Sequence, residues 1–273
     1  MNEFDVPVPG GNLRVVDWPG DGPLVIAAHG ITANALSWAA VARALDGRVR
    51  LVAPDLRGRA RSAALPGPYG LAAHAADLIA VADHLGAAEV ALVGHSMGAF
   101  VVAETAVRYP TRVSSVLLVD GGVPLTLPPG VTPDEALLHT IGPAMQRLSM
   151  TFPTLDSYIA FFERNPALGR YWNADISRYV ERDYNGTGSS CNVEAIRADG
   201  ADFLTSPAAA AGFPILWAPR GMQDQEQGLY DAGQLATMDA EQIPDVNHYT
   251  ILLGAGAARV ADRIHEEVSA PTR

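Results

Sequence analysis

The sequence predicts an α/β protein with a doubly wound, mostly parallel sheet and an inserted helical cap. Continuous apolar runs alternate with stretches of helical spacing, which is typical of parallel strands covered on both faces. The alternation stops after residue 123 and resumes at residue 213. A Gly-x-Ser-x-Gly pattern at residues 94–98 follows one apolar run and precedes a helical stretch.

The elements before the interruption can be assigned in order. Two short alternating segments within residues 4–18 flank Pro9-Gly10-Gly11-Asn12 and predict a hairpin. Parallel strands are expected over residues 24–28, 50–53, 90–93 and 113–119. Helices are expected between them, most clearly over residues 71–85, where apolar residues recur at spacings of four and three and Gly86 follows.

Residues 124–212 carry no predicted strand and hold nine of the 19 aromatic residues of the chain. A long insertion between two strands of a doubly wound sheet finds free space above the carboxyl ends of the strands, where ligands bind. We therefore expect a core of residues 1–123 and 213–273, with residues 124–212 as a helical cap over Ser96. Its aromatic residues favour an apolar or aromatic substrate group.

Composition excludes several classes of protein. A chain of 273 residues that is 48% apolar can bury a large core, and a net charge of −11 argues against nucleic-acid or anionic-membrane binding. The single cysteine, Cys191, excludes an internal disulfide, and no Cys/His cluster has zinc spacing. No secretory signal or apolar stretch of ~20 residues is visible, so we expect a cytoplasmic protein.

The serine of the Gly-x-Ser-x-Gly pattern is the predicted nucleophile. A sharp turn from strand to helix strains the central residue, so its neighbours must be small, and Gly94 and Gly98 meet that need. The strain exposes the hydroxyl of Ser96. The backbone N–H of Met97, at the start of the new helix, points toward an oxyanion that forms beside Ser96.

A serine hydroxyl needs a base within hydrogen-bond reach. Of the seven histidines, His248 lies on a loop between a last strand and the C-terminal helix, where a base can reach the carboxyl edge of the sheet. His95 adjoins Ser96 but projects differently and is expected to be structural. We therefore predict His248 as the general base.

The base needs a carboxylate partner, and two aspartates are candidates. Asp224 follows the strand near Ala218 and gives the chain order Ser, Asp, His, whereas Asp120 ends the strand at residues 113–119. We favour Asp224 and keep Asp120 as the alternative acid. The second oxyanion donor is expected to be the backbone N–H of Ile31, after Gly30.

These features resemble the α/β-hydrolase superfamily over almost the whole chain. The matching segments are His29-Gly30, Pro54 to Ser62, the Ser96 elbow, the inserted cap, a late carboxylate and a terminal histidine. Ala60 replaces a glycine that is common in the second segment. The resemblance implies Ser96 as nucleophile, His248 as base, the Asp224 position as the usual acid, Ile31 and Met97 as oxyanion donors, and no cofactor. A serine in the elbow argues against an epoxide hydrolase or haloalkane dehalogenase.

The sequence thus predicts a serine hydrolase of a carboxylic ester of small to medium size, acting through an acyl-enzyme. A lactonase, a thioesterase or a carbon–carbon bond hydrolase would use the same residues. A small-ligand receptor on the same fold is the alternative outside enzymes. The expected partner is a small-molecule substrate, with no nucleic acid, membrane or metal, and homo-oligomer formation stays open.

Overall fold

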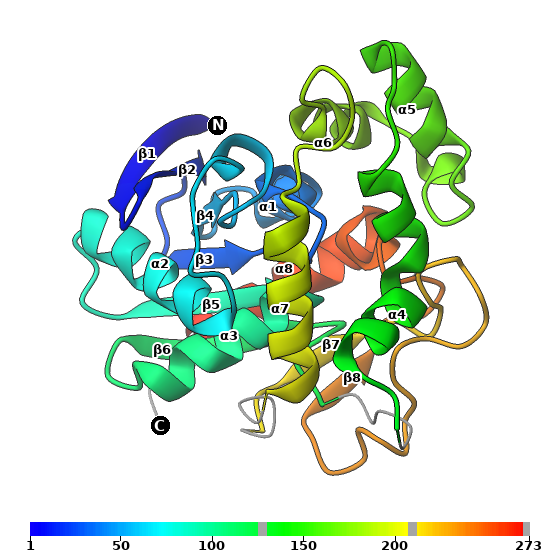
Figure 1. The fold of residues 1–273 in the computed structure, drawn as a ribbon. Helices are drawn as coiled ribbons and strands as arrows, with labels where there is room; N and C mark the ends of the chain where they lie inside the picture. Colours follow the sequence, from blue (N-terminus) through cyan, green and yellow to red (C-terminus); the bar gives the residue numbers. More distant parts are fainter. Residues whose placement is uncertain (125–129, 207–211, 270–273) are drawn as a thin grey trace.

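The computed structural model describes residues 1–124, 130–206 and 212–269, which form an eight-stranded sheet flanked by helices (Figure 1). The sheet order is β1-β2-β4-β3-β5-β6-β7-β8. The strands are β1 (Asn2–Val8), β2 (Gly11–Trp18), β3 (Leu24–Ala28), β4 (Arg50–Pro54), β5 (Val90–His95), β6 (Val113–Val119), β7 (Ile215–Trp217) and β8 (Ala240–Gln242). The predicted α/β fold is confirmed.

The first two strands form the expected antiparallel hairpin, in which Val8 pairs with Gly11. Strand β2 continues antiparallel onto β4, and from β4 to β8 every neighbouring pair is parallel. Strand β5 lies between β3 and β6, so the loops that follow these three strands emerge side by side at one edge. Ser96, the His29-Gly30 loop and Asp120 all follow these strands.

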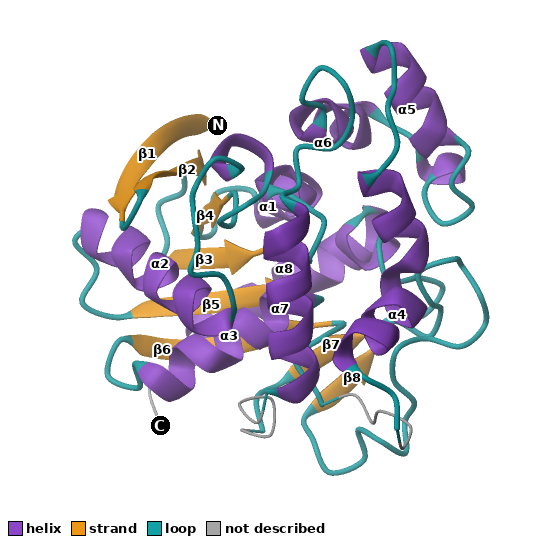
Figure 2. Cartoon of the chain, in the orientation of Figure 1, coloured by secondary structure: helices purple, strands orange, loops and turns teal. Residues whose placement is uncertain are grey.

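Helices cover both faces of the sheet (Figure 2). One face packs against α2 (Leu71–His84) and α3 (Met97–Arg108), and the other against α1 (Ala39–Leu45) and α8 (Gly254–Ser269). The strand residues of the centre are buried on both sides, as in Val90–His95, where all six residues are buried. This two-sided burial explains why these strands read as unbroken apolar runs.

The chain between β6 and β7 is helical in its described part. It contains α4 (Pro133–Leu148), α5 (Leu155–Glu163), α6 (Ala174–Asp183) and α7 (Val193–Thr205). Helix α7 packs against α4 and α2, whereas α5 and α6 lie farther from the sheet (Figure 1). Helix α4 bends where Ile141 leaves helical geometry, two residues before Pro143.

The aromatic residues of this segment form a small core of their own. Its buried members are Phe152, Tyr158, Phe162, Leu168, Ile176 and Val180. Edge-to-face contacts join the rings, for example Tyr158 and Phe162 at 5.2 Å between centroids. Most of the aromatic residues therefore stabilise the helical segment itself.

Candidate functional site

Ser96 occupies the sharp turn between β5 and α3, in a strained backbone conformation with a positive φ of 56° and ψ of −125°. The turn is crowded by backbone on both sides. A Cβ on Gly94 would lie 2.1 Å from the carbonyl oxygen of Gly98, and a Cβ on Gly98 would lie 2.1 Å from that of Ala28. The two glycines are therefore required sterically, and the half-buried Ser96 borders a cavity.

His248 and Asp120 form a buried pair beside this turn. The distance from His248 Nδ1 to Asp120 Oδ2 is 2.7 Å, and the two residues are 2% and 0% exposed. The other carboxylate oxygen of Asp120 accepts the N–H of Ala218 at 3.0 Å. Since an ionised carboxylate only accepts hydrogen bonds, Nδ1 of His248 carries the proton and Nε2 is free to act as a base. Ser96 and His248 both line the cavity.

Asp224, the acid that the sequence favoured, lies elsewhere. Its carboxylate accepts hydrogen bonds from Arg220 at 2.9 Å, Arg170 at 2.8 Å and the Asn247 amide at 3.0 Å. These partners outweigh the opposing effect of burial and lower the pKa of Asp224. The hydrogen bond to His248 that was expected of Asp224 is made by Asp120, the alternative acid.

His95 supports the loop that carries His248. Its Nε2 donates to the backbone carbonyl of His248 at 2.8 Å, and the two rings lie 4.7 Å apart. Burial and the neighbouring His248 hold the pKa of His95 well below its usual value. His95 is therefore a neutral side chain with a structural contact, as the sequence analysis expected.

The loop after β3 lies against Ser96. A Cβ on Gly30 would be 3.2 Å from Cβ and 3.5 Å from Oγ of Ser96. His29 anchors the loop, since its Nε2 accepts the Leu56 N–H at 2.9 Å and its Nδ1 donates to the Gly30 carbonyl at 2.8 Å. Burial lowers the pKa of His29 to about 3, so the ring stays neutral.

Arg59, which is fully buried, contacts both residues expected to supply the oxyanion donors. Its Nε donates to the Ile31 carbonyl at 2.9 Å, and a terminal nitrogen lies 3.7 Å from Sδ of Met97. Asp199 on α7 pairs with the guanidinium. Among the hydrogen bonds of the described residues, neither the Ile31 nor the Met97 amide has a backbone acceptor, so both remain available to a ligand.

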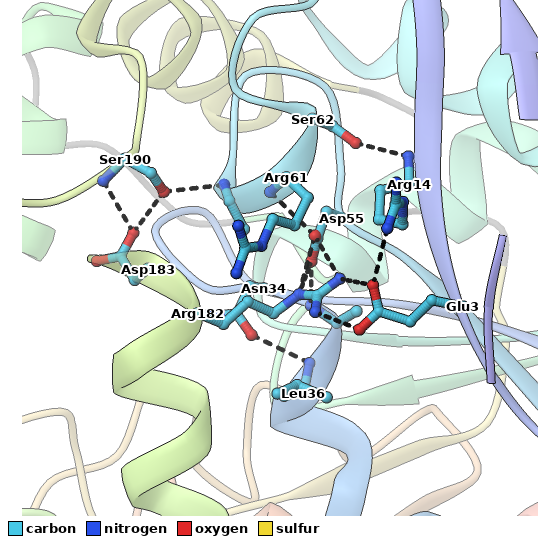
Figure 3. Close-up of polar contacts among 12 residues, drawn as sticks. Glu3, Arg14, Asn34, Leu36, Asp55, Arg61, Ser62, Arg182, Asp183 and Ser190 are labelled. Atoms are coloured by element: carbon cyan, nitrogen blue, oxygen red, sulfur yellow. Dashed lines mark hydrogen bonds and ion pairs between the residues drawn. The ribbon is translucent and has the colours of Figure 1, made fainter. Parts of the chain in front are cut away.

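Helix α6 is fastened to the sheet by its last turn (Figure 3). Arg182 bridges the buried Asp55, at 2.9 Å, and Glu3 of β1, at 2.8 Å. The next residue, Asp183, faces the helical segment. Its carboxylate accepts hydrogen bonds from the Arg147 guanidinium at 2.7 Å and from the Ser190 hydroxyl at 2.9 Å. Adjacent residues of opposite charge thus join α6 to the strands on one side and to its neighbouring helices on the other.

A cavity of about 570 Å³ adjoins Ser96 and is bounded by the helical segment, the loop after β3 and the loop after β7. This volume lies within the usual range for small-molecule sites. Its apolar lining includes Ile31, Leu36, Ile141, Pro143, Ala144, Leu168, Ile176, Met222, Leu229, Leu252 and Leu253. The aromatic residues that line it are Tyr179 and Tyr249.

Residues 23–183 match the family described as the alpha/beta hydrolase fold. The chain belongs to the α/β-hydrolase family. It is 34% identical over 136 residues to a putative carbamate hydrolase RutD of Klebsiella pneumoniae (strain 342), covering 48% of this chain and 50% of that protein. It is 31% identical over 156 residues to the uncharacterized protein Rv2715 of Mycobacterium tuberculosis, covering 53% and 43%. The chain thus spans about half the length of these relatives.

Solved structures of similar fold cover nearly the whole α/β-hydrolase chain. An E-2-(acetamidomethylene)succinate hydrolase has a TM-score of 0.75 at 23% identity, with coverages of 98% and 99%. A thioesterase domain from the curacin biosynthetic pathway has a TM-score of 0.71 at 21% identity, with coverages of 97% and 99%. These structures share the fold of this chain over nearly its whole length.

Sequence reasoning missed three charged residues of this α/β-hydrolase that organise the site: Arg59, Asp199 and Arg182. Two signals were available. Arg59 lies in the segment after Pro54, and Asp199 stands three and four residues from Ile196 and Phe203, on the apolar side of a helical stretch. Within the described residues, no group of three His, Cys, Asp or Glu side chains could hold a metal, and no helix is long and apolar enough to cross a bilayer.

Proposed function

We propose that this α/β-hydrolase cleaves a carboxylic ester of a small to medium, apolar substrate through an acyl-enzyme on Ser96. The observation that carries the proposal is the buried hydrogen bond between His248 Nδ1 and Asp120, at 2.7 Å, beside a strained serine that borders the same cavity. One relative is named a putative carbamate hydrolase, and two structures of similar fold are named a thioesterase and an esterase. Carbamates, thioesters and esters all contain a carbonyl carbon that a serine can attack, which supports this reaction class.

The proposed reaction begins when His248 Nε2 takes the proton of Ser96 as its oxygen attacks the substrate carbonyl. The carbonyl oxygen becomes an oxyanion and accepts the N–H groups of Ile31 and Met97. His248 then returns the proton to the leaving alcohol, and an acyl-enzyme remains. A water molecule activated by His248 releases the acid. Asp120 holds the imidazole in the required tautomer and stabilises the imidazolium.

The helices between β6 and β7 serve as the cap in this proposal. Helices α4 and α6 contribute residues to the cavity wall, among them Ile141 and Ile176, so the cap determines which acyl and alcohol groups reach Ser96. Residues 125–129 and 207–211, where the predicted cap joins the core, lie outside the described residues.

The test is Ser96→Ala, measured with a panel of short esters, lactones, acyl thioesters and diketone acids. The variant should lose ester turnover while its thermal unfolding stays unchanged. Full residual activity would exclude Ser96 as nucleophile. A fluorophosphonate probe should label Ser96 at a rate usual for serine hydrolases, whereas a ligand receptor would label slowly. Preferred turnover of another substrate class would identify the corresponding alternative enzyme.

A further inference from the structure

The cavity beside Ser96 contains no arginine or lysine among its described lining residues. We infer that the enzyme takes electrically neutral substrates and rejects substrates that place a carboxylate inside the cavity. This inference rests on the proposed serine hydrolase and names its substrate class.

Every potential carboxylate partner is an arginine, because the 19 basic residues of the chain include no lysine. Four arginines of the described residues are buried, and all are already paired: Arg57 with Asp77, Arg59 with Asp199, Arg147 with Asp183, and Arg182 with Asp55. None of them borders the cavity. A substrate carboxylate would therefore find no guanidinium within the described cavity wall.

The two histidines of the cavity do not replace an arginine. His95 is uncharged and its Nε2 proton is already donated to the His248 carbonyl at 2.8 Å. His248 is bonded to Asp120, and it must be neutral to accept the serine proton. The positive charge that it gains during the reaction arises only after the serine has been deprotonated, and it is already balanced by the carboxylate of Asp120.

Among the described residues of its wall, the cavity carries one acid, Asp175, near the start of α6. Its partner Arg43 borders an adjoining surface pocket, which Asp175 also lines, and is largely exposed, with 64% of its side chain accessible. A substrate carboxylate would meet the carboxylate of Asp175 inside the cavity, whereas Arg43 lies outside the cavity wall. An ion transferred from water without a partner is strongly disfavoured.

The remaining lining suits a neutral molecule. Apolar atoms predominate in the described wall, with leucine, isoleucine, methionine, proline and alanine side chains among them, and most of its polar groups are neutral. Besides Ser96 and the two tyrosines, the hydroxyl and amide side chains of the wall are Thr32, Ser37, Thr140, Gln223, Gln225 and Gln227. Hydroxyls and amides can bond to the ether, carbonyl or hydroxyl oxygens of an uncharged ester without any charge to neutralise.

The experiment compares two isosteric esters, p-nitrophenyl 6-methylheptanoate and mono-p-nitrophenyl adipate, which differ by an isopropyl group in place of a carboxylate. The wild-type enzyme should show kcat/KM at least about 100-fold higher for the neutral ester, because the carboxylate loses its hydration without a partner. Values within about threefold of each other would overturn the inference.

Asp175→Asn isolates the contribution of the resident acid. In this variant the ratio of kcat/KM for the neutral ester to kcat/KM for the adipate ester should fall about 3- to 10-fold. The fall is expected because the substitution removes a like charge and leaves Arg43 without its partner, which raises kcat/KM for the adipate ester. Asp262→Asn is the matched control, because Asp262 pairs with Arg48 on the surface away from the cavity. Equal preference ratios in both variants would overturn the role assigned to Asp175.

A binding measurement separates this inference from the proposed function. The corresponding p-nitroanilides are not esters, so their binding to Ser96→Ala can be measured by calorimetry without ester cleavage. The neutral anilide should bind, and its carboxylate analogue should bind at least about 30-fold more weakly. If wild type and Ser96→Ala hydrolyse the esters equally, the serine mechanism fails. The affinities of the two anilides still test whether the cavity prefers a neutral ligand over a carboxylate. Equal affinities would overturn this inference.

Discussion

Asp120→Asn tests the orientation of the proposed base. The N–H of Ala218 lies 3.0 Å from Asp120 Oδ1 and can pair only with an acceptor, so the amide oxygen of Asn would take that position. Its NH2 group would then face His248 Nδ1, at the position now 2.7 Å away. The imidazole would have to accept at Nδ1 and carry its proton on Nε2. In this tautomer His248 cannot take the proton of Ser96.

The expected loss follows from this tautomer change. Triad enzymes lose about 10⁴-fold in kcat when the acid becomes an amide. We expect a loss of about 10³- to 10⁴-fold here, which corresponds to about 4 to 5.5 kcal/mol in the activation free energy. The assay is kcat for a neutral p-nitrophenyl ester near pH 8, with thermal unfolding to verify that the variant is folded.

Asp224→Asn is the control, because both aspartates follow neighbouring strands and only their contacts differ. Its partners are Arg170, Arg220 and Asn247, so its removal should change kcat by less than about threefold. The reasoning is refuted if Asp120→Asn keeps more than a tenth of wild-type activity, or if Asp224→Asn causes the larger loss.

Three further predictions follow from the contacts around the site. Arg59→Met should lower kcat about 10- to 100-fold, with KM little changed, and should weaken the binding of a trifluoromethyl ketone in parallel. Arg57→Met is the control and should affect stability alone. Equal losses of kcat in the two variants would contradict a positioning role for Arg59. Gly121→Ala should reduce activity and lower the free energy of unfolding by about 1 to 3 kcal/mol, because its Cβ would lie 2.2 Å from the Ser96 carbonyl oxygen; a fully active, equally stable variant would contradict the packing. Since the folded-state pKa of His29 is about 3, below its unfolded value of 6.5, stability is complete above pH 6.5 and decreases by about 1.4 kcal/mol per pH unit below it. The free energy of unfolding of His29→Gln, measured with urea at several pH values, should depend less steeply on pH than that of wild type. An equally steep dependence on pH would count against this assignment.

The elbow was predictable because its determinants are local. An apolar strand, two small residues and a helix start are all encoded within residues 90–102, and the backbone of Ser96 adopts the strained conformation that this pattern requires. The position of His248 was also predictable, since it lies on a loop at the carboxyl edge of the sheet.

The aromatic residues of the segment before β7 were harder to interpret. Their helical spacing indicates a buried face, but spacing does not say what the face is buried against. In the structure, Phe152, Tyr158 and Phe162 pack on one another, and the cavity wall is mainly aliphatic. The preference for an apolar substrate remains a prediction, and it now depends on the leucine and isoleucine side chains.

The choice between the two aspartates depended on strand order, which the linear sequence does not contain. Strand β6 lies directly beside β5, so Asp120, the first residue after β6, is one strand away from Ser96. Asp224 lies seven residues beyond the end of β7, which is two strands away, on a loop whose Arg220 pairs with Asn247. His248 follows Asn247 and is held by the Arg220 carbonyl at 3.1 Å. The loop after β7 thus positions the backbone of the base, while the shorter connection from β6 brings the carboxylate to its ring.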